Sequence, residues 1–172
     1  MIYFGIESSS QKVLDYYKKG ITPNQSEMAV AKARKAGVDV IVGSFIIGAP
    51  NETKKDIQKT FDFAQRIEVD IPQISILEAN PGTPIWDEFK NNGLLREENY
   101  WETGVFISDL CKNTVPINEL KLMIHDFYKI LLKRPRYILK QLLLTIGSSY
   151  RQNVVLNNLN RISAIKDNIS NL

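Results

Sequence analysis

The first 77 residues contain three short apolar runs separated by longer segments in which apolar and polar positions follow helical spacing. The runs are residues 1–7 (MIYFGIE), 38–48 (VDVIVGSFIIG) and 72–77 (PQISIL). Isoleucine, valine and phenylalanine favour strands, and the uninterrupted central run predicts a strand buried on both faces. Strands that alternate with helices over short joins predict βαβ units, and therefore a parallel sheet with right-handed crossovers.

Helix signals occupy the two segments between these strands. Residues 8–20 have Ser8 and Gln11 at capping-box spacing, and Gly20 supplies a helix stop. Val13, Leu14 and Tyr17 form the apolar stripe of this helix. A second helix begins at Thr22, which a proline follows at the first helical position, and it runs to a glycine stop. Both segments are therefore predicted to be helical.

A third helix follows the central strand. Thr53 and Asp56 have the spacing of an N-terminal cap, and Ile57, Phe61 and Ala64 fall on one helical face. This helix is predicted to lie against the sheet.

Beyond residue 80 the pattern changes from strands to helices. Helices are predicted at 85–91, 118–133 and 136–146, and a weaker one at 152–169, with Pro135 separating the two central helices. The helix 118–133 is amphipathic, and its apolar stripe consists of Leu120, Ile124, Phe127 and Leu131. The second half of the chain is therefore predicted to be helical.

Composition narrows the class of protein. The formal charge of +3 does not indicate nucleic-acid binding. The basic stretch KRPRYILK is typical of a solvent-exposed helix face. Cys111 is the single cysteine, so the chain can form no internal disulfide and no cysteine-rich metal site, and His125 reads as a surface residue. The single cysteine fits a reduced, cytoplasmic setting. No signal peptide and no apolar run of about 18 residues is present, which predicts a soluble protein without a membrane span.

Polar residues lie at the ends of all three predicted strands, and Gly48 lies at the end of the central one. In parallel α/β folds ligands bind at the carboxyl ends of the strands. Glu7 and Ser8 are suited to hydrogen-bond the hydroxyls or amine of a ligand. The missing Cβ of Gly48 admits a flat ring, against which Ile46 packs. The candidate residues are Glu7, Ser8, Ile46, Gly48, Glu52, Glu78 and Asn80.

Each candidate also has a purely structural interpretation. Ser8 is suited to cap a helix, Gly48 to form a turn, and Glu52 to lie at the positive end of a helix dipole. Glu78 fits a solvated strand end, and Cys111 fits an inert thiol. The residues alone leave both interpretations open.

Three phrases in the order of the chain resemble one family. GIESSSQKVLDYYKKGIT (5–22) is similar to the GIESGSQ stretch of radical S-adenosylmethionine enzymes. VGSFIIGAPNETKKDIQKTFDFA (42–64) resembles their GxPgET segment, and QISILEANPGTPIWDEFKNNGLL (73–95) resembles their PGTPLY…GLL segment. The tail FYKILLKRPRYILKQL (127–142) resembles the branch with a cobalamin-binding domain, the Fe–S oxidoreductases or class B methylases, so the resemblance covers residues 1–147.

The resemblance implies a fold and cofactors. The fold is the second half of a partial (β/α)6 TIM-like barrel over residues 1–97, followed by a helical C-terminal extension over residues 98–172. The cofactors are S-adenosylmethionine and a 4Fe–4S cluster held by a CxxxCxxC loop, with cobalamin as a further candidate. Reductive cleavage of S-adenosylmethionine to a 5′-deoxyadenosyl radical would then serve methyl transfer or oxidoreduction. The cofactor itself supplies the difficult chemistry.

The resemblance also implies roles for single residues. Glu7 and Ser8 match the ribose or methionine contact. Ile46, Gly48 and Glu52 match the adenine-side strand, and the backbone near Leu77 and Glu78 matches a further adenine contact. No metal ligand and no catalytic residue is assigned, because the CxxxCxxC loop is absent and one cysteine cannot hold the cluster.

Three hypotheses follow. In the first, the chain belongs to a radical enzyme whose cluster-bearing N-terminal half is a separate or missing part, and it is inactive alone. In the second, it is a non-catalytic remnant or interaction module, which pairs with that half or with a second copy through its open strand edge. In the third, it is an unrelated barrel hydrolase that uses Glu7, Glu52 and Glu78 as paired carboxylates. The substrate is not predicted.

Overall fold

A computed structural model describes residues 1–95, 97–98, 100, 105–111, 114–154 and 156. The chain divides into two compact units, Met1–Lys129 and Ile130–Leu172, and each is described by itself. The predicted boundary after residue 97 was drawn from the family resemblance and stays a prediction.

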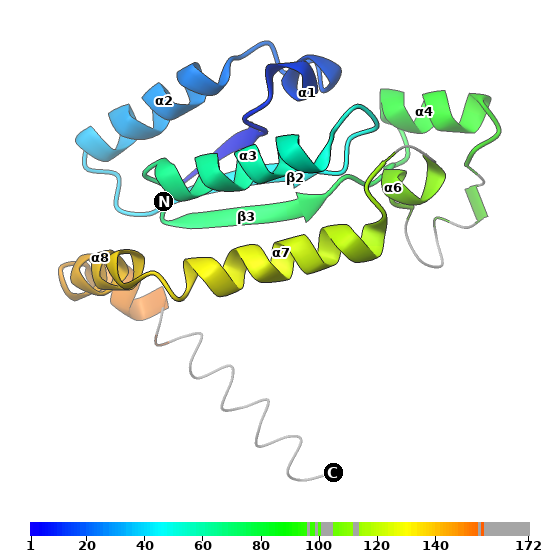
Figure 1. Ribbon diagram of the computed structural model, residues 1–172. Helices are drawn as coiled ribbons and strands as arrows, with labels where there is room; N and C mark the ends of the chain where they lie inside the picture. Colours follow the sequence, from blue (N-terminus) through cyan, green and yellow to red (C-terminus); the bar gives the residue numbers. More distant parts are fainter. Residues whose placement is uncertain (96, 99, 101–104, 112–113, 155, 157–172) are drawn as a thin grey trace, which may run out of the picture. The chain divides into compact units, whose positions relative to one another are not determined.

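The first unit contains a three-stranded parallel sheet (Figure 1). Its strands are β1 (Ile2–Glu7), β2 (Ile41–Ile47) and β3 (Ile71–Ile76), and their order in the sheet is β1-β2-β3. In the register Val42 lies beside Tyr3 on one side and Ile71 on the other. The predicted α/β class with a parallel sheet is confirmed, and the three strands are consistent with part of a radical-enzyme barrel.

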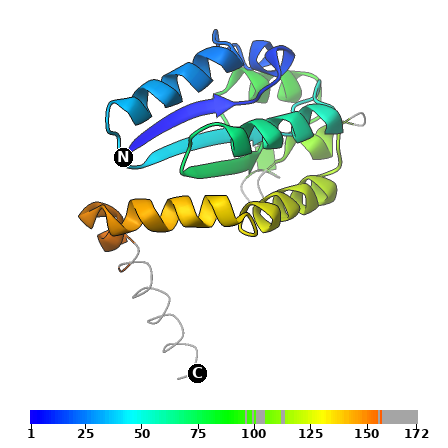
Figure 2. The ribbon, with the colours of Figure 1, turned by 60° about the vertical axis from the view of Figure 1, so that its left-hand side comes forward.

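Helices connect and follow these strands (Figures 1 and 2). The helices α1 (Gln11–Tyr16) and α2 (Pro23–Lys35) join β1 to β2, and α3 (Lys54–Arg66) joins β2 to β3. After β3 come α4 (Pro84–Asn91), α6 (Ile107–Leu110) and α7 (Ile117–Leu131). The predicted helices of this unit are therefore present, apart from details at their ends.

Local capping explains two of the helix starts. The Thr22 side chain accepts a hydrogen bond from the Gln25 amide, and the Gln25 side chain accepts one from the Thr22 amide. Thr53 and Asp56 form the same reciprocal pair at the start of α3. Each box satisfies two amides that the helix itself leaves without partners, so these starts depend on adjacent residues alone.

The predicted start and end of the first helix were wrong. Ser10 occupies the N-cap position of α1, and the Ser8 hydroxyl makes no capping box with Gln11. The helix ends at Tyr16, before Gly20, because the chain turns through a left-handed conformation at Lys18, with a φ of 53°. The Ser8 hydroxyl instead contacts α3, as described below.

The two faces of the sheet differ in exposure. Phe45, Ile47 and Ile74 are buried on the face that carries α3, where Ile57, Phe61 and Ala64 of the helix are buried too. On the other face Ser44 and Ile46 are only half-buried, and Tyr3, Gln73 and Ser75 are exposed. Burial of β2 on both faces was therefore predicted correctly for five of its seven residues and wrongly for Ser44 and Ile46. Among the described residues, no layer of side chains closes this second face.

The helix α7 lies along the free edge of β3 (Figures 1 and 2). The Tyr128 hydroxyl accepts a hydrogen bond from the Ile74 amide at 3.0 Å and donates one to the Pro72 carbonyl at 3.1 Å. Phe127 stacks on Phe61 of α3 with ring centroids 4.9 Å apart. A tyrosine therefore occupies the backbone positions that a neighbouring strand would otherwise pair.

We expect Tyr128→Phe to lower the free energy of unfolding by about 1–2 kcal/mol, because two partly buried hydrogen bonds are lost while the ring remains. Tyr3→Phe is the matched control, since the Tyr3 side chain is 62% exposed on β1 and should change stability by less than about 0.5 kcal/mol. Urea denaturation measures both. Equal effects of the two substitutions would show that Tyr128 does not hold the edge of β3.

The second unit contains α8 (Pro135–Ile146), and residues 149–154 are also helical. The predicted helix 136–146 is confirmed. Most of the predicted helix 152–169 lies outside the described residues. None of the helices in the described parts of the chain is both long and apolar enough to span a bilayer.

Candidate functional site

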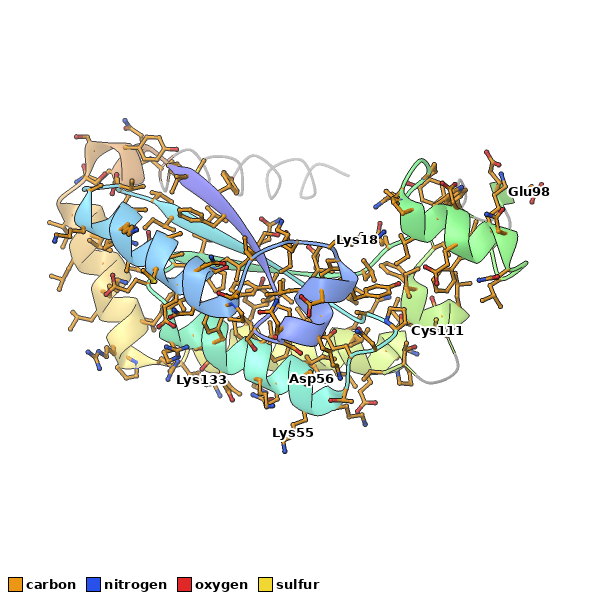
Figure 3. The ribbon with its side chains drawn as sticks, turned by 90° about the horizontal axis from the view of Figure 1, so that it is seen from above. Lys18, Lys55, Asp56, Glu98, Cys111 and Lys133 are labelled. Atoms are coloured by element: carbon orange, nitrogen blue, oxygen red, sulfur yellow. The ribbon has the colours of Figure 1, made fainter. Side chains whose placement is uncertain are left out.

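The three parallel strands end at a common edge of the sheet, which we call the carboxyl rim. The helix α1 begins beyond this rim, and α4 and α6 lie at the same end of the sheet (Figures 1 and 3). The rim comprises Glu7 at the end of β1 and Ser8 after it, Gly48 to Glu52 after β2, and Leu77 and Glu78 after β3. All seven candidates of the family resemblance therefore belong to this edge or to the strand end beside it.

Glu7 ends β1 in an unusual conformation. Its φ is 64°, and the ladder to β2 is irregular between Gly5 and Glu7. The Oε1 atom of Glu7 accepts a hydrogen bond from Lys19 Nζ at 2.7 Å, whereas Oε2 is buried and has no hydrogen-bond partner. A Cβ at position 5 would lie 2.6 Å from Oε1, so Gly5 is the residue that allows the Glu7 side chain to fold back over the strand.

Ser8 is fully buried, and its hydroxyl connects the β1–α1 loop to α3. Ser8 Oγ lies 3.1 Å from Thr60 Oγ1 and accepts a hydrogen bond from the Ser10 amide at 3.1 Å. Thr60 Oγ1 also accepts from the Ser9 amide at 3.2 Å. The hydroxyl of Ser8 is thus engaged inside the protein, and its contact with a ligand stays a prediction.

Glu52 braces the turn after β2. Its Oε2 atom accepts hydrogen bonds from the Gly48 amide at 2.6 Å and from the Ala49 amide at 3.3 Å. The side chain is 3% exposed, and Oε1 is buried without a partner. Burial raises the pKa of Glu52 to about 7, against the opposing effect of the two amides.

Gly48 has a conformation and a neighbour that favour glycine. Its φ is +92°, and a Cβ at this position would lie 2.9 Å from Leu120 Cδ1 of α7. The side of Gly48 that a Cβ would occupy is therefore filled by α7. A flat ring that approaches Gly48 must use the opposite side of the peptide.

Tyr17 is a rim residue that sequence reasoning missed, because it was assigned to the apolar stripe of the first helix. Its hydroxyl is buried and has no hydrogen-bond partner. Burial, and then the nearby carboxylates of Glu52 and Glu7, raise its pKa well above the usual range of tyrosine. A tyrosine in an otherwise aliphatic stripe was the available signal, since its hydroxyl needs a partner once buried.

Three buried polar atoms without protein partners therefore belong to neighbouring residues of the rim. They are Glu7 Oε2, Tyr17 Oη and Glu52 Oε1. Buried polar atoms of this kind are uncommon, and each costs about 1–3 kcal/mol unless a ligand or water satisfies it. Two carboxylate acceptors beside a phenol suit a ligand that carries hydroxyl or amino donors.

The remaining candidates lie around this cluster or apart from it. Ile46 is half-buried on the open face of β2. The Leu77 carbonyl accepts a hydrogen bond from the Ile107 amide at 3.1 Å, while exposed Glu78 forms an antiparallel bridge with Phe106. The backbone of Leu77 and Glu78 therefore pairs with the segment at the start of α6, and the Glu78 side chain faces solvent.

Cys111 and His125 carry no sign of a metal site. Cys111 is half-buried, and burial raises the pKa of its thiol, as does nearby Glu88. His125 is exposed on α7, as predicted. Within the residues that the structure describes, no three His, Cys, Asp or Glu side chains come together as metal ligands.

A groove of about 420 Å³ lies between α2 and α3. Its lining includes Glu27 and Arg66, which pair with each other, and Phe63, over whose ring the Arg66 guanidinium lies. None of the residues that line the groove has a buried polar atom without a partner, in contrast to the rim.

Comparison with known proteins shows that this chain is similar to members of one enzyme superfamily. Residues 1–64 match the sequence model of the Radical SAM superfamily. The chain is also 35% identical over 142 residues to an uncharacterized methyltransferase of Pyrococcus horikoshii, a match that covers 82% of this chain and 30% of that protein.

Two further relatives match shorter stretches. A putative methylthiotransferase of Methanocaldococcus jannaschii is 40% identical over 86 residues, which is 50% of this chain and 19% of that protein. A tRNA-2-methylthio-N(6)-dimethylallyladenosine synthase of Buchnera aphidicola is 32% identical over 98 residues, which is 56% of this chain and 22% of that protein. The chain therefore spans less than a third of the length of each of these relatives.

Proposed function

Because the chain belongs to the radical S-adenosylmethionine superfamily, we propose that it supplies the S-adenosylmethionine-binding rim of a methyl- or methylthiotransferase. The names of the three relatives support transfer of a methyl or methylthio group. The observation that carries the proposal is the cluster of unpartnered buried atoms of Glu7, Tyr17 and Glu52.

The residues of the rim fit S-adenosylmethionine. The ribose hydroxyls and the amino groups of this cofactor are hydrogen-bond donors, and the cluster offers two carboxylate oxygens and a phenol. Half-buried Ile46 provides apolar surface for the adenine on the open face of β2. When bound, S-adenosylmethionine would supply the radical chemistry of this superfamily. The residues of the rim hold and orient the cofactor, and Glu52 keeps the β2–α3 turn in place.

The 4Fe–4S cluster that the superfamily implies does not fit this chain. Three cysteine ligands are required, and the 172 residues contain only Cys111. We therefore propose that these residues alone do not cleave S-adenosylmethionine, and that a cluster-bearing segment or chain completes the site. The resemblance of residues 1–147 to the cobalamin-dependent branch supports cobalamin as a further cofactor of the complete protein.

The proposal also includes pairing with another chain or segment through the edge of β1. Within the described part of the chain β1 is an outer strand of the sheet, and Tyr3 near its start is exposed. An unpaired strand edge accepts another strand, so this edge suits the remaining barrel strands or a second copy. Membership of the superfamily leaves the hypothesis of an unrelated carboxylate hydrolase without support.

We expect the 172-residue chain to bind S-adenosylmethionine at a one-to-one ratio, and Glu7→Gln to weaken this binding about tenfold, because one charged acceptor of the rim is lost. Isothermal titration calorimetry measures both affinities. The matched control is Lys19→Gln, which removes the partner of Glu7 but keeps the carboxylate, and it should change the affinity by less than about threefold.

Two outcomes would contradict the proposal. Absence of saturable heat with the folded chain would remove the rim as a cofactor site. Equal weakening by Glu7→Gln and Lys19→Gln would show that the ion pair matters only for structure, and circular dichroism would verify that both variants are folded.

A further inference from the structure

The helix α8 exposes a continuous apolar stripe. None of its residues is buried, and five aliphatic side chains on one side of the helix are between 41% and 74% exposed. They follow the spacing i, i+1, i+4, i+5 and i+8, which places them on one face. These residues are Ile138, Leu139, Leu142, Leu143 and Ile146.

The charges around this stripe all have one sign. Residues 130–156 contain five lysine or arginine residues and no aspartate or glutamate, although the whole chain carries a formal charge of only +3. Arg136 and Lys140 are one helical turn apart, and helical spacing places both beside the stripe at Leu143. The five basic residues are Lys133, Arg134, Arg136, Lys140 and Arg151. The Arg151 side chain is buried and donates a hydrogen bond to Gln141 Oε1, so it does not border the stripe.

We infer that α8 binds the surface of an anionic lipid bilayer. An aliphatic face bordered by lysine and arginine is the arrangement of helices that lie in the plane of the interface, with basic side chains among the lipid headgroups. The 12 residues of α8 are too few to cross a bilayer of about 30 Å, so the helix lies on the surface. This inference is independent of the S-adenosylmethionine site.

Two other occupants fit the observations less well. A second copy that docked through the same face would bring two sets of basic residues together, and their like charges would oppose the contact. Nucleic acid would engage the basic residues, but recognition of single strands relies on aromatic stacking, which an aliphatic stripe does not provide.

Vesicle flotation of the 172-residue chain tests the inference. We expect a partition coefficient about tenfold higher for vesicles of phosphatidylcholine and phosphatidylglycerol at 3:1 than for pure phosphatidylcholine. Leu142→Glu and the double variant Arg136→Gln with Lys140→Gln should each lower the partition about tenfold. Leu122→Glu is the matched control and should leave binding unchanged, because Leu122 is a leucine of α7 with similar exposure, 64% against 56% for Leu142.

Several results would overturn the inference. They are absence of flotation with both vesicle types, equal loss for Leu142→Glu and Leu122→Glu, and an oligomer in light scattering that Leu142→Glu disrupts while vesicles fail to bind. Binding of an RNA oligonucleotide that needs Arg136 and Lys140 but not Leu142, without vesicle binding, would favour nucleic acid instead. Circular dichroism of each variant, and a milder Leu142→Ser variant, exclude unfolding as the cause of a loss.

Discussion

Gly48→Ala is expected to lower the free energy of unfolding of the chain by about 3 kcal/mol, because alanine is strained there and has no space. The φ of Gly48 is +92°, a conformation that non-glycine residues rarely adopt, and the new Cβ would lie 2.9 Å from Leu120 Cδ1. Urea denaturation measures the change.

Gly37→Ala is the matched control for this substitution. Gly37 also has a positive φ, 81°, but a Cβ there meets nothing within 4 Å. Alanine at this position should therefore cost only the backbone strain, about 1 kcal/mol. If both substitutions cost the same, the contact between α7 and the turn after β2 is not as tight as the structure indicates.

The second large effect is a pH dependence of stability that originates from Glu52. Burial raises the pKa of this carboxyl from 4.5 to about 7 in the folded chain. Below pH 4.5 both the folded and the unfolded chain are protonated at Glu52, and this contribution to stability is fully present. As the pH rises from 4.5 to 7 only the folded chain retains the proton, so stability falls, by about 3 kcal/mol in total.

Glu52→Gln should remove this pH dependence. Glutamine keeps an oxygen that can accept a hydrogen bond from the Gly48 amide, but it has no charge to bury. The free energy of unfolding of this variant should therefore be nearly constant between pH 5 and 8. The lowered pKa of Asp56, about 2, acts in a more acidic range and does not overlap this window. Equal urea midpoints of the wild-type chain at pH 5 and pH 8 would contradict this prediction. They would show that the Glu52 carboxyl group is either exposed to solvent or has a partner for Oε1.

Binding of a ligand to Glu52 should be linked to the same proton. Hydrogen bonds from ligand donors to Oε1 favour the ionised form and lower its pKa. S-adenosylmethionine is therefore expected to restore, at and above pH 7, some of the stability that the chain loses as the pH rises from 4.5 to 7. The carboxyl group that stabilises the turn after β2 would then also contact the cofactor.

Features set by adjacent residues were predicted from the sequence, and features set by distant ones were not. The caps at Thr22 and Thr53 depend on residues three positions away, and both were found. The predicted cap at Ser8 failed because its hydroxyl bonds to Thr60, 52 residues further along the chain. A local pattern carries no information about such a partner.

The candidate site shows the same limit. Glu7 and Glu52 were predicted to lie at one edge because they end or follow strands, and the ends of parallel strands meet at one edge. Their contact with a cofactor stays a prediction. Tyr17 was missed because its place in an apolar stripe indicated a core residue, whereas its hydroxyl belongs to the rim. Gly48 was singled out as a turn or ring-contact position. The Leu120 side chain of α7, which a Cβ at Gly48 would meet, could not be read from the residues around it.

The most direct test of the account is a titration of the ¹⁵N-labelled chain with S-adenosylmethionine, followed through its amide resonances. The account predicts saturable shifts at the rim, above all for Gly48 and Ala49, whose amides bond to Glu52, and none for Gly37. Shifts confined to the groove between α2 and α3, or no shifts at saturating cofactor, would contradict the assignment of the rim as the S-adenosylmethionine site.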